Sequence, residues 1–131
     1  MKRLLTVSLA LALVALFAFS GAFAAEGKKE AKSQSWTGEV VDLGCYMGHA
    51  AMGEKHMECG LKCVAGGMPM GLVVKGNKVF VLTMNHDNGD AFNACKGWVS
   101  QQVKITGTMA TRGGLQSIDV AAAELAAAPA K

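Results

Sequence analysis

Residues 70–84 decide the fold of this chain, and they read MGLVVKGNKVFVLTM. Two runs rich in β-branched and other apolar residues, which favour strands, are separated here by Gly76 and Asn77. A short Gly-Asn connection between two such runs is typical of a β-hairpin. The stretch therefore predicts two antiparallel strands that are neighbours in a sheet.

Three more strands and one short helix are predicted around this hairpin. The sequence WTGEVVD at residues 36–42 predicts a strand before it. After it, residues 87–98 have apolar side chains at helical spacing, which predicts a short helix. Apolar and polar residues then alternate over 103–109, and a turn leads into a last run at 115–120. The predicted fold class is all-β with one short helix.

The predicted order of elements is strand, long loop, strand, strand, helix, strand, strand, which is the order of the five-stranded Greek-key barrel called the OB-fold. The chain resembles small exported bacterial OB-fold proteins in GEVVD at residues 38–42 and in VKITGT at 103–108. The resemblance covers residues 36–120 and implies an OB-fold-like barrel with a Cys/Met/His-rich insertion between strands 1 and 2. A five-stranded sandwich or meander is the alternative.

The N-terminus has the features of a cleavable signal peptide, residues 1–24. Lys2 and Arg3 precede an uncharged apolar run at residues 4–19, and an Ala-Phe-Ala motif ends at Ala24. The apolar run is shorter than the roughly 20 residues that a membrane-spanning helix needs. We therefore expect a periplasmic or secreted protein with no membrane anchor after cleavage.

The exported chain is expected to hold one domain. Residues 25–35 are rich in Lys, Glu and Ser and predict a flexible leader, residues 36–120 predict the OB-fold-like domain, and residues 121–131 predict an Ala-rich tail. Of the 13 Lys and Arg residues, two belong to the signal, which leaves 11 against 10 acidic residues and a net charge of about +1. Such a balance gives no reason to expect nucleic acid as a partner.

The insertion between the first two strands carries the candidate metal ligands. His56, Cys59 and Cys63 are spaced three and four residues apart, so that on a helix starting near residue 53 they share one face, which Met52 extends. Cys45 is expected to approach them from the preceding loop. Three thiols and one imidazole form a ligand set that zinc accepts, and the sulfur ligands equally suit copper(I).

A second resemblance concerns the end of the insertion. Met68-Pro69-Met70 is similar to the Met-x-Met motif at a strand entrance in periplasmic copper- and silver-binding OB-fold chaperones. The Trp that this family carries three residues before the first Met is Ala65 here. The resemblance implies that Met68 and Met70 are thioether ligands for copper.

Two interpretations of the four cysteines remain open. In the first, the insertion holds or buffers copper or zinc, and the protein is a binding protein without enzymatic turnover. In the second, Cys45 forms a disulfide with Cys59 or Cys63, because export leads to an oxidising compartment. The protein is then a stapled module without a metal, which binds another exported protein or a small ligand. Redox-active thiols are a third interpretation. Cys95 is expected either to pair with a loop cysteine or to be a buried free thiol.

Overall fold

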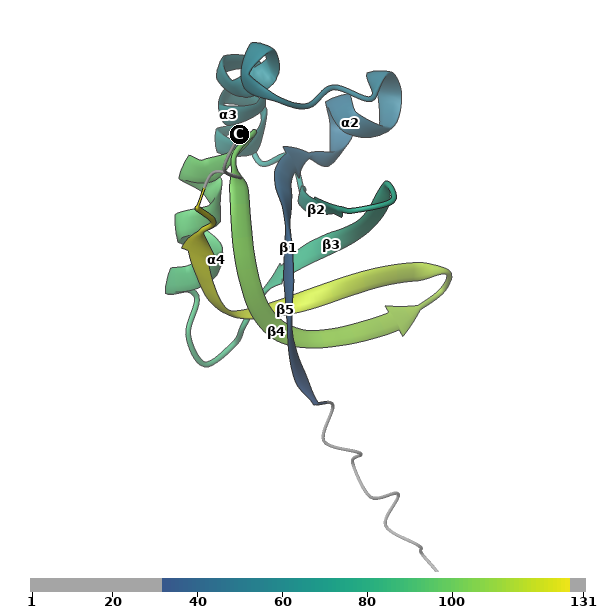
Figure 1. Cartoon of the computed structure of the whole chain (residues 1–131), viewed down its shortest axis with the longest axis vertical. Coiled ribbons are helices and arrows are strands. Elements are labelled where there is room, and N and C mark those ends of the chain that lie inside the picture. The colour runs from purple at the N-terminus through teal and green to yellow at the C-terminus, as the bar shows by residue number, and fades with distance from the viewer. Residues whose placement is uncertain (1–31, 128–131) are drawn as a thin grey trace, which may run out of the picture. The chain divides into compact units, whose positions relative to one another are not determined.

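The computed structural model describes residues 32–127 and shows a mostly β protein (Figure 1). Its strands are β1 (Ser33–Asp42), β2 (Met70–Val74), β3 (Lys78–Met84), β4 (Gln102–Arg112) and β5 (Leu115–Leu125). Its helices are α2 (Leu43–His49), α3 (Met57–Ala65) and α4 (Asp90–Cys95), with short 3₁₀ turns η1 (Glu54–His56) and η2 (Lys96–Trp98).

The five strands form a closed ring in the order β1-β2-β3-β5-β4, with β4 pairing back to β1. All neighbours are antiparallel except β3 and β5, which are parallel. The predicted hairpin is confirmed, because β2 and β3 pair from Gly71 with Val81 to Val74 with Lys78. Its connection contains Gly76 at φ 85° and Asn77 at φ 57°, the left-handed conformation that glycine and asparagine tolerate best.

The hydrophobic core lies inside this ring. Every strand contributes fully or almost fully buried side chains, among them Val40, Leu72, Phe80, Ile105 and Ile118. On β4 the burial alternates, since Val103, Ile105 and Gly107 are buried and the residues between them are not, as the sequence pattern predicted. The predicted all-β class is therefore confirmed at the level of a closed, mostly antiparallel sheet around one core.

The expectation of a single short helix is wrong. Helix α4 does lie between β3 and β4, as predicted, but the insertion between β1 and β2 also folds into α2, η1 and α3. Both helices of the insertion lie at one end of the ring (Figure 1). Helix α2 forms because the Asp42 side chain caps it, accepting a hydrogen bond from the Cys45 amide at 2.8 Å.

Helix α3 depends on Gly60, a buried residue in its interior. A Cβ atom at Gly60 would lie 2.6 Å from a methyl group of Val99 and 3.3 Å from the Asp42 carboxylate. Glycine therefore lets α3 pack directly on the core and on Asp42, and this close approach outweighs its low helix propensity.

Two element boundaries differ from the prediction. Strand β1 begins at Ser33, within the expected flexible leader, and β5 continues to Leu125, within the expected Ala-rich tail. Both extensions pair with β4: Ser33 lies opposite Thr108, and Leu125 lies opposite Val103. The hydrogen bonds of a sheet join backbone groups, so polar and small residues are ordered here by their neighbour strand.

The remaining predictions about the termini concern residues outside the described region. These are the signal peptide at 1–24, the leader up to residue 31, and residues 128–131 of the tail. Within residues 32–127, none of the helices has the length and apolar character needed to cross a membrane.

The strand phase of β4 can be tested with Ile105→Asp. Ile105 is fully buried, so we expect the substitution to destabilise the fold by several kcal/mol or to prevent folding, because it buries an unpaired charge. The matched control is Thr106→Asp, whose side chain points outward and whose hydroxyl lies 2.7 Å from that of Ser35. We expect it to cost less than about 1 kcal/mol. Urea unfolding measures both, and equal losses would contradict the assigned phase.

Candidate metal centre

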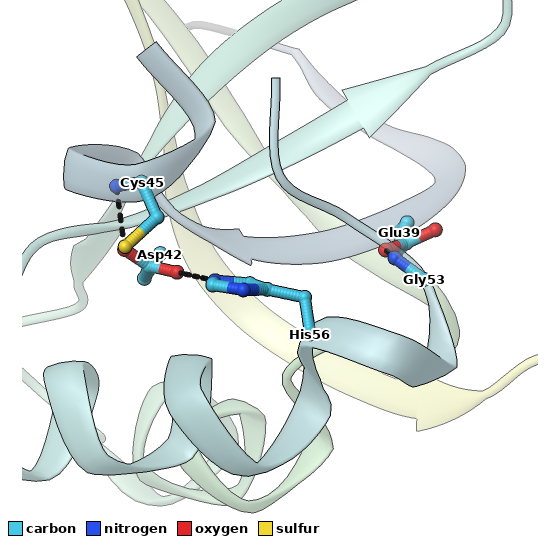
Figure 2. Close-up of polar contacts among 5 residues, drawn as sticks. All are labelled: Glu39, Asp42, Cys45, Gly53 and His56. Carbon is cyan, nitrogen blue, oxygen red and sulfur yellow. Dashed lines mark hydrogen bonds and ion pairs between the residues drawn. The ribbon is translucent and has the colours of Figure 1, made fainter. Parts of the chain in front are cut away.

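Asp42 is the centre of the polar contacts in the insertion. It is the last residue of β1, and its side chain is fully buried. One carboxylate oxygen accepts the Cys45 amide hydrogen, and the other lies 2.7 Å from Nε2 of His56. Figure 2 shows Asp42 between Cys45 and His56. This one side chain therefore joins the start of α2 to the start of α3.

A second buried acid on β1 anchors the middle of the insertion. The Glu39 carboxylate accepts a hydrogen bond from the backbone amide of Gly53, directly before η1 (Figure 2). Gly53 has φ 78°, a conformation that an L side chain rarely adopts. Glu39 and Asp42 together hold both ends of the segment that leads to His56, so β1 fixes where α3 begins.

Three cysteine sulfurs converge between the two helices. Cys45 comes from α2, whereas Cys59 and Cys63 lie one turn apart on α3. Their Sγ atoms all lie within 4.8 Å of one another. Donor atoms that bind one ion at about 2.3 Å lie roughly 4 Å from each other, so small side-chain rotations allow all three to reach a common ion. Cys59 is exposed and the other two are half-buried.

A second group of donors shares one member with the first. An oxygen of Asp42, the sulfur of Cys45 and a ring nitrogen of His56 also lie within 4.8 Å of one another. Cys45 thus belongs both to an all-sulfur group and to a mixed oxygen, nitrogen and sulfur group. Either group is able to hold a metal ion.

The contacts of Asp42 set the protonation of the site. The pKa of the Cys45 thiol is raised to about 12. The larger cause is a hydrogen bond to the Asp42 carboxylate, and the second is burial. Burial also raises the pKa of Cys63. For Asp42 itself, burial favours the neutral acid, but the hydrogen bonds from Cys45 and His56 together outweigh it and lower the pKa. At neutral pH the metal-free site therefore combines an ionised carboxylate with protonated Cys45 and Cys63.

The structure places the predicted ligands in two groups instead of one. It brings Cys45, Cys59 and Cys63 together, as predicted. His56 is separated from that set, because η1 ends at this residue and its ring turns to the end of β1 instead of continuing the α3 face. It joins Cys45 through Asp42.

The three predicted methionine ligands differ in their positions. Met70 is 2% exposed and packs in the hydrophobic core, so its role is packing. Met52 lies in the exposed connection between α2 and η1. Met68 lies near Gly44, since a Cβ atom there would meet the Met68 sulfur at 2.8 Å, and the Met68 amide donates to the Cys63 carbonyl at 2.9 Å.

Asp42 is the ligand candidate that the sequence analysis missed. A signal was present, because an aspartate that ends an apolar strand three residues before Cys45 occupies a typical N-cap position. Cys95 is a free, fully buried thiol in the core, one of the two alternatives considered for it. Burial raises the pKa of Cys95 to about 11, which is consistent with an unreactive packing residue.

Comparisons with protein-family models, with curated proteins and with solved structures found no significant match to this chain. Its function is therefore inferred from the geometry of its own residues.

The effect of Asp42 on Cys45 can be measured in the reduced, metal-free protein. We expect Asp42→Asn to lower the pKa of Cys45 from about 12 towards that of an ordinary thiol, because the amide carries no charge to hold the thiol proton. Residue-resolved alkylation as a function of pH, read by mass spectrometry, gives this pKa. Glu58→Gln removes an exposed carboxylate of α3 and should leave it unchanged. An unaltered Cys45 pKa in a folded Asp42→Asn variant would contradict the assigned hydrogen bond.

Proposed function

We propose that this protein is a small exported binding protein that holds or buffers a soft metal ion, copper(I) or zinc, at Cys45, Cys59 and Cys63. The observation that carries the proposal is the convergence of three sulfurs from two helices to within 4.8 Å. Thiolates are the preferred protein ligands of copper(I) and are common zinc ligands. The proposed periplasmic or secreted location rests on the signal-like sequence at residues 1–24.

We also propose that the ring is an OB-fold-like Greek-key barrel. The support is its strand order with the parallel β3–β5 contact, together with helix α4 between β3 and β4. In this barrel the metal site occupies the insertion between strands 1 and 2. The strands then serve as a rigid base that fixes both ends of the insertion.

The accessibility of the site fits binding and exchange of an ion. Cys59 is exposed, so an arriving ion meets one thiol before it reaches the half-buried Cys45 and Cys63. These two have raised pKa values and must release protons when they bind. Metal affinity should therefore rise with pH over the whole neutral range, and mild acid should favour release.

The same thiols offer a second function. A Cys45–Cys63 disulfide would link α2 to α3, and the two sulfur atoms lie within 4.8 Å of each other. The insertion would then be a stapled surface for another exported protein or a small ligand. Since Cys95 lies in the core, this leaves Cys59 as an odd, exposed thiol. The odd number favours a three-thiolate metal site over a purely structural disulfide.

The proposal predicts that the reduced mature protein binds one copper(I) at the three-thiol group. We expect Cys59→Ser to weaken binding by at least about 100-fold, since loss of a partner outside the ligand shell already costs about 10–100-fold. For each proton that the metal displaces, the copper affinity should fall by about tenfold for every unit by which the pH is lowered. Competition with a chelator of known copper affinity measures both effects.

Cys95→Ser is the matched control. It removes a sulfur from the core and should lower the melting temperature, because it buries a hydroxyl group, while copper affinity stays the same. Equal affinities for the wild type and Cys59→Ser would exclude the three-thiol site. A mature protein purified with an intact loop disulfide and without metal would support the stapled module instead.

A further inference from the structure

The buried carboxylate of Asp42 has no permanent cation beside it in the described part of the chain. None of its side-chain surface is exposed, and its ion-pair partner there is His56, which is charged only when protonated. The two lysine ion pairs of residues 32–127 are exposed and involve other carboxylates. Buried charges are usually paired with an opposite charge or bound to a metal ion. The surroundings of Asp42 thus favour a bound cation.

The donors next to Asp42 differ in chemistry from the three-thiol group. Asp42, Cys45 and His56 offer one oxygen, one sulfur and one nitrogen within 4.8 Å of one another. Such a mixed set is typical of zinc and similar divalent ions, whereas the all-sulfur set suits a soft monovalent ion. The two donor groups, which meet at Cys45, therefore suit two different kinds of metal ion.

We propose that this protein binds two metal ions bridged by the Cys45 sulfur: a soft monovalent ion at Cys45, Cys59 and Cys63, and a divalent ion of the zinc type at Asp42, Cys45 and His56. The first ion is that of the proposed function, on which this inference rests. A thiolate sulfur has lone pairs for two metal ions at once. The two groups share only this donor, so neither ion deprives the other of its remaining two ligands.

Charge balance supports the simultaneous binding of both ions. With three thiolates and the Asp42 carboxylate ionised, the donors carry four negative charges. A single copper(I) would leave three of these uncompensated around a carboxylate that is wholly buried. A copper(I) and a zinc(II) together leave only one. The divalent ion would also replace the hydrogen that Asp42 and His56 share across 2.7 Å.

Sequential loading followed by native mass spectrometry tests this inference. Reduced protein is given one equivalent of copper(I), is freed of excess metal and then receives zinc(II). We expect one copper and one zinc per chain, with the copper retained. Loss of copper as zinc enters, or a total of one ion, would overturn the two-ion site but not the proposed function. Failure to bind either ion would overturn both the two-ion site and the proposed function.

Variants then assign the second ion. We expect His56→Gln to bind copper(I) normally and to lose at least about tenfold of its zinc affinity. Cys59→Ser should weaken copper(I) binding and leave the zinc affinity unchanged, and Cys45→Ser should weaken the binding of both ions. His49→Gln changes an exposed histidine of the same insertion and should change neither. Zinc binding that is unaffected in His56→Gln would place the second ion elsewhere and refute the assignment.

Cobalt(II) used in place of zinc gives a readout that does not depend on how well the variants fold. In the copper-loaded wild type, cobalt bound at the proposed position should show a sulfur-to-cobalt charge-transfer band from Cys45. Cobalt that binds without this band would lack the bridging sulfur and would contradict the proposal.

Discussion

The structure of the insertion depends on the burial of one carboxylate. Asp42 is the last residue of β1, at the point where the insertion leaves the sheet, and its side chain is fully removed from solvent. An ionised group in that position must be satisfied by donors. The donors are the first turn of α2 and the imidazole of His56, so satisfying this charge positions the helices that carry the thiols.

The strand ring fixes both ends of the insertion. Asp42 is paired directly with Met70, and the Leu43 amide donates to the Pro69 carbonyl at 2.9 Å, so the insertion leaves and re-enters the sheet at one place. Within the insertion, Val64 belongs to the core and Leu61 packs against it. The order of the insertion comes from Glu39, Asp42 and the packing of Gly60 and Val64, and a bound metal would add to it.

Protonation connects the structure to the proposed function. The thiolate is the form that oxidises and exchanges disulfides, and the raised pKa values of Cys45 and Cys63 keep these residues as thiols at neutral pH. In the proposed oxidising location, this would slow the formation of a disulfide before metal is bound. In the proposed function, a metal ion would compete with these protons, because it would gain several thiolates at once. Asp42 would thus protect the Cys45 thiol and increase the pH dependence of the proposed binding.

The sequence by itself determined the hairpin, the alternation along β4, the position of α4 and the spacing that puts Cys59 and Cys63 on one side of α3. These features follow from local periodicity and turn preferences, which depend mainly on neighbouring residues in the sequence. Only the tertiary structure decided that His56 turns to Asp42 and that Met70 belongs to the core. Those outcomes depend on how α2 and α3 pack against the end of β1, and that packing is set by a buried charge whose partners are up to 14 residues away.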